Sequence, residues 1–214
     1  MFAVPRPPLM DAQDWKYEMR REMQEILPGL WLGPIQSAKN VQALKEHGIT
    51  HVVCIRDSGE KHIVRPFFPT DFIYYEIEVS DSPMQNLIPY FPDAKKFIGN
   101  ALNQGGRVFV HCNGGISRSP AFVVAFVMES QHWDYHTAFS FVQNKASVVA
   151  LRFCMNPIEQ FKLQLKEYEP IYNARENIAS LNYTPEQTLM QGAKRRPMPD
   201  EDDEDMGMEV ETTS

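Results

Sequence analysis

The segment His111-Cys112-Asn113-Gly114-Gly115-Ile116-Ser117-Arg118-Ser119 combines a cysteine, two glycines, an arginine and two hydroxyls. It follows Arg107-Val108-Phe109-Val110, which predicts a buried strand, and precedes the apolar run 120–128, which predicts a buried helix. A short loop that enters a helix points its backbone N–H groups inward, and the helix dipole adds partial positive charge there. We therefore expect residues 112–117, called the cysteine loop below, to bind a phosphate group.

The residue types of the cysteine loop suit that task. Gly114 and Gly115 permit close approach of the backbone to an anion, and Arg118 offers a planar fork of donors for two phosphate oxygens. The residues expected to surround the phosphate are Asn113, Gly114, Gly115, Ile116, Ser117 and Arg118. Helix N-termini and cations favour a thiolate, so we expect Cys112 to attack phosphorus and form a phosphocysteine. The alternative is that Cys112 is only a small buried apolar residue.

Two roles are open for each of the residues that flank the loop. Ser119 either caps the helix or donates a hydrogen bond to the cysteine sulfur as that sulfur leaves. His111 either orients the loop and tunes the thiolate, or is simply a hydrogen-bonded histidine at the end of a strand.

The leaving oxygen of a phosphomonoester needs a proton, so a carboxylic acid must face the cysteine. Asp81 is our candidate, in a predicted surface loop that follows the apparent strand from Phe72 to Val79. Asp57, which follows the strand Thr50 to Ile55, is a weaker rival.

The pattern His-Cys-x-x-Gly-x-x-Arg-Ser resembles the signature of the cysteine-dependent protein phosphatases, and the short domain resembles their dual-specificity branch. That resemblance implies an α/β fold whose central, mostly parallel sheet is flanked by helices. It also places Asp81 at the position of the general acid, and Arg152 to Pro157 at an Asn-Pro element before the last helix. Low-molecular-weight phosphatases fit poorly, because their cysteine loop lies near the N-terminus.

A narrower resemblance, carried by Met19 to Leu30 and Gln164 to Glu169, is to the serine/threonine/tyrosine-interacting proteins. Their vertebrate members are pseudophosphatases that have glycine in place of the nucleophile. This chain differs from them, because Cys112 is present together with Asp81, Arg118 and Ser119. A second difference is a run of extra residues near Lys145 to Leu151.

Strands interspersed with helices predict a sheet with helices on its faces, and ligands of such sheets bind at the carboxyl ends of the strands. We expect a flexible segment over 1–24, the phosphatase domain over 25–175 and a disordered tail over 176–214. The helices expected along the way are Ser37 to His47, a helix that Pro92 opens and Gly105-Gly106 ends, Tyr135 to Gln143, and Pro157 to about Tyr172.

The composition of the chain indicates its cellular compartment. Its net charge is −7, and an acidic run at 200–205 lies in the expected tail. Three cysteines argue against a disulfide framework, and no stretch is apolar enough to span a membrane. We expect a cytoplasmic protein, and Lys194-Arg195-Arg196-Pro197 is a weak candidate for nuclear import.

Two functions follow from these residues. The first is a protein phosphatase that acts on phosphotyrosine and phosphoserine/threonine, with no cofactor and no metal. The second is a non-catalytic adaptor that binds phosphoproteins. Expected partners are phosphorylated proteins, with mitogen-activated protein kinases suggested at family level, and neither nucleic acid nor membranes. A phosphoinositide or RNA phosphatase fits less well, because the cysteine loop contains no lysine before Arg118.

Overall fold

The computed structural model describes residues 22–148 and 155–180. Contacts divide the chain after Ala174, and the fold below is that of the unit that ends there. Residues 1–21 of the expected flexible segment, residues 152–154 of the Asn-Pro element and residues 181–214 of the expected tail lie outside the described residues. The expected bounds are wrong at both inner ends, because Gln24 belongs to the first strand and residues 176–180 continue the last helix.

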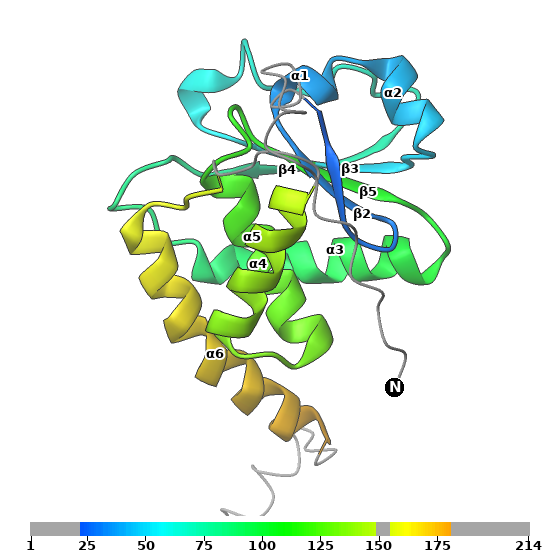
Figure 1. Ribbon diagram of the computed structural model, residues 1–214. Coiled ribbons are helices and arrows are strands. Elements are labelled where there is room, and N and C mark those ends of the chain that lie inside the picture. Colours follow the sequence, from blue (N-terminus) through cyan, green and yellow to red (C-terminus); the bar gives the residue numbers. More distant parts are fainter. Residues whose placement is uncertain (1–21, 149–154, 181–214) are drawn as a thin grey trace, which may run out of the picture. The chain divides into compact units, whose positions relative to one another are not determined.

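Five strands form one sheet in the order β1-β2-β5-β3-β4 (Figure 1). The strands β2 (Leu30–Gly33), β5 (Val108–His111), β3 (His51–Arg56) and β4 (Ile73–Glu78) run parallel, and β1 (Gln24–Leu27) pairs antiparallel with β2. This arrangement confirms the predicted central, mostly parallel sheet. Every residue of β5 is buried, as expected for a central strand. The cysteine loop therefore leaves the sheet at its centre, from the carboxyl end of a strand.

Helices cover both faces of the sheet. Residues of α2 share a buried cluster with Val52 and Phe109, whereas residues of α3, α4, α5 and α6 share another with Val53 and Val110. The α-helices are α1 (Ile35–Ala38), α2 (Val41–Glu46), α3 (Phe91–Asn103), α4 (Arg118–Gln131), α5 (Tyr135–Val148) and α6 (Glu159–Ser180). Two short 3₁₀ helices, η3 (Ser58–Glu60) and η4 (Ile88–Tyr90), lie in the connections.

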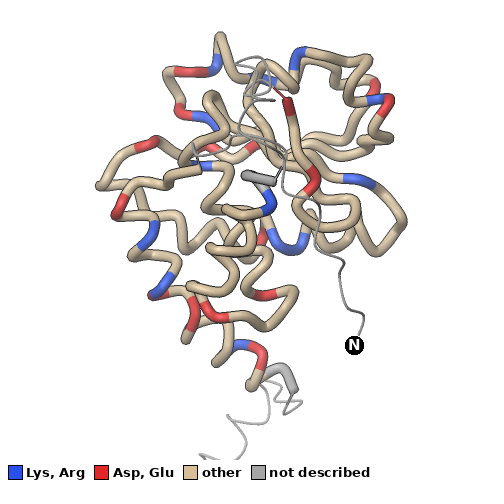
Figure 2. The backbone as a smooth tube through the Cα atoms, viewed as in Figure 1, with Lys and Arg blue, Asp and Glu red and all other residues tan. Residues whose placement is uncertain are grey.

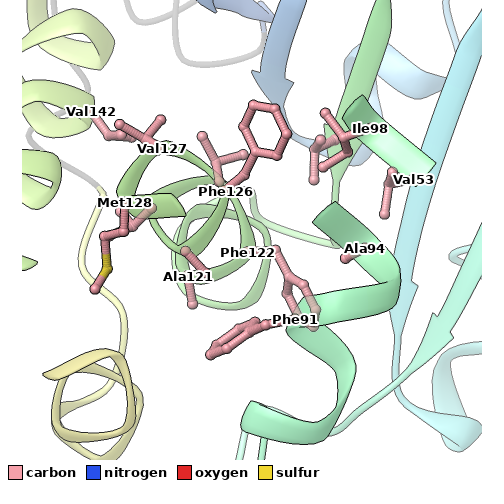
Figure 3. Packing of buried hydrophobic residues seen from close by; sticks show 14 of the residues in the cluster. Val53, Phe91, Ala94, Ile98, Ala121, Phe122, Phe126, Val127, Met128 and Val142 are labelled. Carbon is pink, nitrogen blue, oxygen red and sulfur yellow. The ribbon is translucent and has the colours of Figure 1, made fainter. Parts of the chain in front are cut away.

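The α4 helix is the centre of the larger cluster. It is buried on all sides from Arg118 to Glu129, as its nearly continuous apolar sequence predicts. Figure 3 shows Phe122 and Phe126 of α4 near Phe91 and Ile98 of α3. The predicted apolar stripe of α6 also packs in this cluster, through Phe161, Leu165, Tyr168 and Tyr172, with Ile158 partly buried beside it. A packed helix of this kind gives the cysteine loop a rigid support.

The single helix predicted over Ser37 to His47 is wrong. The chain forms two short helices instead, with a break at Lys39 and Asn40. The Asn40 side chain accepts a hydrogen bond from Ala43 N at 3.1 Å and so caps the second helix. Asparagine is among the best N-cap residues, which explains why a new helix starts there.

Candidate active site

Cys112 lies at the base of the cysteine loop and is only 2% exposed. Two donors point at its sulfur: Gly115 N lies 3.2 Å from Sγ, and Ser119 Oγ lies 3.1 Å from it. Ser119 occupies the first turn of α4. Its hydroxyl is therefore placed for the second of the two predicted roles, donation to the sulfur. Both donors stabilise negative charge on Sγ, whether the thiol ionises or the sulfur acts as a leaving group.

Neighbouring segments hold the cysteine loop in shape. Ile35 N donates to Asn113 O at 3.0 Å, and Asn156 N donates to Ile116 O at 3.0 Å. Gly115 has a φ of 67°, and a Cβ there would lie 2.8 Å from the carbonyl carbon and oxygen of Gly33. Only glycine fits this position without strain. The loop is thus clamped between the end of β2 and the segment that leads into α6.

Glu60 holds the Arg118 guanidinium, a contact that the sequence analysis missed. Arg118 Nη1 and Nη2 donate to Oε2 and Oε1 of Glu60 at 2.5 Å and 3.0 Å, and Asn113 Nδ2 donates to Oε1 at 3.1 Å. The hydrogen bond from Arg118 lowers the pKa of Glu60 to about 2. Burial lowers the pKa of Arg118, but Glu60 and other acidic groups, including Asp81, outweigh that effect and raise it. The arginine therefore stays charged in its buried position.

One nitrogen of the Arg118 guanidinium takes no part in these hydrogen bonds. Its Nε is buried and has no hydrogen-bond partner among the residues that the structure describes. Buried donors are nearly always paired, so an unpaired one needs an explanation. An anion bound in the cysteine loop would accept from Nε and from the second proton of Nη2, which is the side-on pairing that guanidinium makes with phosphate.

The structure separates the two candidate acids. Asp57 accepts a hydrogen bond from Gly59 N at 2.8 Å, and its own N–H donates to Glu60 Oε2 at 2.9 Å, so it caps η3. Asp81 instead reaches the cysteine loop, where Ser117 Oγ donates to its Oδ1 at 2.6 Å. Asp81 is otherwise exposed. The structure thus brings Asp81, and not Asp57, to the loop as the candidate proton donor.

Residues 80–87, called the acid loop below, are braced by side chains far along the chain. Ser80 N donates to Gln85 Oε1 at 3.0 Å. Gln164 of α6 accepts from Leu87 N at 2.7 Å and donates to Gln85 O at 2.8 Å. Sequence reasoning also missed Gln164, which looks like one polar residue of an amphipathic helix.

His111 is completely buried at the end of β5. Burial lowers the pKa of His111 to about 4, against a smaller opposite effect of the Cys112 carbonyl. Nδ1 lies 3.2 Å from that carbonyl oxygen, and the ring stacks on Phe109 with centroids 5.4 Å apart. A buried, neutral ring suits the orienting role predicted for His111 better than a role in proton transfer.

The described residues contain neither a candidate metal site nor a helix that could span a membrane. Within 22–148 and 155–180, no cluster of three or more His, Cys, Asp or Glu side chains could hold a metal ion. No described helix has the length and apolar character needed to cross a membrane. Figure 2 shows that acidic and basic residues are interspersed along the described part of the backbone.

Comparison with known proteins gives consistent matches. The model of the dual specificity phosphatase catalytic domain matches residues 30–171. The serine/threonine/tyrosine-interacting protein of Homo sapiens is 47% identical over 174 residues, which cover 80% of this chain and 75% of the relative. Protein phosphatase Slingshot homolog 3 of Mus musculus is 34% identical over 149 residues, which cover 70% of this chain but 21% of that protein.

A solved structure agrees with these sequence matches. The crystal structure of the human tyrosine phosphatase-like serine/threonine/tyrosine-interacting protein superposes with a TM-score of 0.66 at 48% identity. The match covers 71% of this chain and 98% of that one.

Proposed function

Because this chain belongs to the dual specificity phosphatase family, we propose that its cysteine loop binds phosphorylated protein side chains and that Cys112 hydrolyses them. One observation carries the proposal: the loop of a buried cysteine with two donors on its sulfur leads directly into an arginine whose Nε is unpaired among the described residues. The first feature suits a nucleophile and the second suits a phosphate.

The first chemical step is attack of Cys112 Sγ on phosphorus. Arg118 and the loop N–H groups hold the non-bridging oxygens, where charge must be stabilised during transfer. Asp81 gives its proton to the leaving oxygen as the P–O bond breaks and the S–P bond forms. The dephosphorylated side chain then leaves as an alcohol or phenol.

The second step releases the enzyme. Water attacks the phosphocysteine, and Asp81, now a carboxylate, accepts the proton of that water. Ser119 Oγ, 3.1 Å from Sγ, donates a hydrogen bond to the thiolate as the S–P bond breaks. These residues supply each acid, base and nucleophile that the reaction needs, so we propose a mechanism without a metal or organic cofactor.

A single substitution tests this function. Cys112→Ser should abolish turnover of a phosphotyrosine peptide and keep its binding, because the loop N–H groups and Arg118 remain. Rapid quenching of the wild type with labelled peptide should also trap a phosphocysteine. Turnover that survives in Cys112→Ser would contradict the proposed nucleophile.

A second function is favoured by the relatives. Those at 47–48% identity are named as an interacting protein and as tyrosine phosphatase-like. An adaptor would use the same loop and the same free Nε of Arg118 to bind phosphoproteins without hydrolysing them. Tight binding of a phosphopeptide by the wild type, with no trapped intermediate and no turnover, would establish this function over the first.

The partner class is the same for both functions. We propose phosphorylated proteins as partners, with mitogen-activated protein kinases as family-level candidates, in the cytoplasm. The variant Asp81→Ala should retain a substrate in the cysteine loop, because it lacks the proposed proton donor. Phosphopeptides enriched by this variant over Arg118→Met would identify the partner.

A further inference from the structure

Ser117 links the two sides of the candidate active site through a directed chain of hydrogen bonds. Ile158 N donates to Ser117 Oγ at 3.3 Å, and Ser117 Oγ lies 2.6 Å from Asp81 Oδ1. A backbone N–H can only donate, so Ser117 Oγ must be the acceptor in the first bond. The single proton of the hydroxyl is therefore free to point at Asp81. While Asp81 is a carboxylate, which can only accept, the hydrogen bonds run from Ile158 N through Ser117 Oγ to Asp81 Oδ1.

This hydrogen bond distinguishes the two oxygens of Asp81. Oδ1 accepts from Ser117, which leaves Oδ2 as the oxygen that can face the leaving group of a substrate. Ser117 is only 6% exposed, whereas Asp81 is an exposed residue on a loop. The buried hydroxyl is thus a fixed point against which an otherwise rotatable carboxyl group is held.

The same bond changes strength during the reaction. A hydrogen bond to an ionised carboxylate is roughly twice as strong as one to a neutral acid. Donation from Ser117 therefore becomes more favourable as Asp81 Oδ2 releases its proton to the leaving oxygen. This gain occurs in the transition state, which is where an interaction must strengthen in order to raise kcat.

We propose that Ser117 is a positioning residue, which orients Asp81 for proton transfer through its side chain while its backbone belongs to the phosphate-binding loop. The proposal rests on the hydrolytic function proposed above. It assigns the Ser117 hydroxyl and the Ile158 N–H to the proton-transfer step, and it leaves phosphate binding to Arg118 and the loop N–H groups.

Leaving groups of different basicity provide the test. A tyrosine leaving group has a pKa of about 10 and needs a proton, whereas p-nitrophenolate is stable enough to leave with little help. Ser117→Ala should lower kcat for a phosphotyrosine peptide about 10-fold or more, which is part of the roughly 10²–10⁴-fold that a general acid contributes, and lower it much less for p-nitrophenyl phosphate. Ser117→Thr, which keeps the hydroxyl, should restore most of the loss.

Two further measurements exclude a merely structural effect. The double variant Ser117→Ala/Asp81→Asn should be no slower than Asp81→Asn alone, because both changes disable one step. Ser82→Ala is the matched control. The Ser82 hydroxyl accepts from Met84 N at 3.3 Å in the same acid loop, and within the described residues it makes no hydrogen bond to Asp81 or to the cysteine loop. Ser82→Ala should change kcat for the two substrates by the same factor or leave both values unchanged.

The outcomes separate this inference from the proposed function. Wild-type protein that turns over neither substrate would overturn the hydrolytic function, and this inference with it. Wild-type turnover with equal losses for both substrates in Ser117→Ala, or a double variant with additive losses, would overturn the role of Ser117 alone. If Ser117→Ala does not fold, Ser117→Cys keeps nearly the same volume but replaces the hydroxyl with a weak S–H donor. It should show the same dependence on the leaving group, and its absence there would count against the inference.

Discussion

At the scale of single residues, the site depends on which groups are kept charged and which are kept neutral. His111 is buried, its Nδ1 lies against the Cys112 carbonyl, and its Nε2 has no hydrogen-bond partner among the described residues, so its low pKa follows from burial. Glu60 is the opposite case, because the hydrogen bond from Arg118 holds its pKa at about 2. The cysteine loop is therefore bordered by a neutral imidazole and a permanent carboxylate at neutral pH.

The neutral imidazole makes stability depend on pH. Its pKa is about 4 in the folded protein, against about 6.5 when unfolded, so the unfolded state binds more protons between these values. The contribution of neutral His111 to the free energy of unfolding is fully present above the unfolded pKa, and it decreases as pH drops from about 6.5 toward about 4. We expect the free energy of unfolding in urea to be about 2 kcal/mol lower at pH 5 than at pH 7 on account of His111. His111→Gln should lack this part of the slope, and an unchanged slope would contradict the buried neutral state.

Glu60 predicts a separate effect at lower pH. Its pKa is about 2 in the folded protein and ordinary when unfolded, so its stabilising contribution is present above the unfolded value of about 4.3. That contribution disappears as pH falls from there toward the folded pKa. Glu60→Gln should flatten the loss of stability below pH 4 in the same urea titration, and should leave the slope between pH 5 and 7 as in the wild type.

At the scale of elements, the β5–loop–α4 unit depends on its fit against β2. Gly115→Ala would force a side chain into positive φ and place its Cβ 2.8 Å from the backbone of Gly33. The left-handed conformation alone costs roughly 1–2 kcal/mol, and the clash adds to it. We expect thermal unfolding at lower temperature and weaker binding of inorganic phosphate, as measured by calorimetry.

Gly114→Ala is the matched control for that change. A Cβ at Gly114 would meet only the Ile116 side chain, at 3.3 Å, and this glycine does not have positive φ. The Gly114→Ala protein should therefore unfold at a temperature much closer to that of the wild type than the Gly115→Ala protein does. Equal damage from both substitutions would show that the clamp against β2 does not set the shape of the loop.

The same elements explain what the sequence could and could not predict. Residues 107–128 carry a strand, a glycine loop and a buried helix in continuous order, so local patterns sufficed for β5 and α4. Glu60 contacts Arg118 across 58 positions, and Gln164 contacts Leu87 across 77, and no local pattern reports such pairs. The capping box that begins at Asp57 was the available signal for Glu60, but it indicates only the start of a helix and not a contact with Arg118.

At the scale of the folded unit up to Ala174, one buried carboxylate joins three helices. Glu129 of α4 accepts a hydrogen bond from Tyr168 Oη of α6, and its Oε2 lies 3.0 Å from Lys95 Nζ of α3. The Glu129 side chain is 1% exposed, so it depends on these donors for the solvation that water would give. This cluster lies at the far end of α4 from the cysteine loop, and so it supports the scaffold without touching the phosphate site.

Tyr168→Phe tests this division between scaffold and site. It removes a donor from a buried charge, which costs about 1.5–3 kcal/mol for hydrogen bonds to charged groups. Tyr172→Phe is the matched control on the same helix, because the Tyr172 hydroxyl donates to a backbone carbonyl, that of Trp133, at 2.9 Å. A neutral hydrogen bond contributes only about 0.5–1.5 kcal/mol, so urea unfolding should rank Tyr168→Phe as the less stable variant. Both variants should bind a phosphotyrosine peptide as the wild type does while folded, because these hydroxyls contact Glu129 near the C-terminal end of α4 and Trp133 O beyond it, whereas the cysteine loop precedes the N-terminus of α4. Weaker peptide binding by folded Tyr168→Phe would mean that the three-helix cluster also sets the geometry of α4 at its N-terminus.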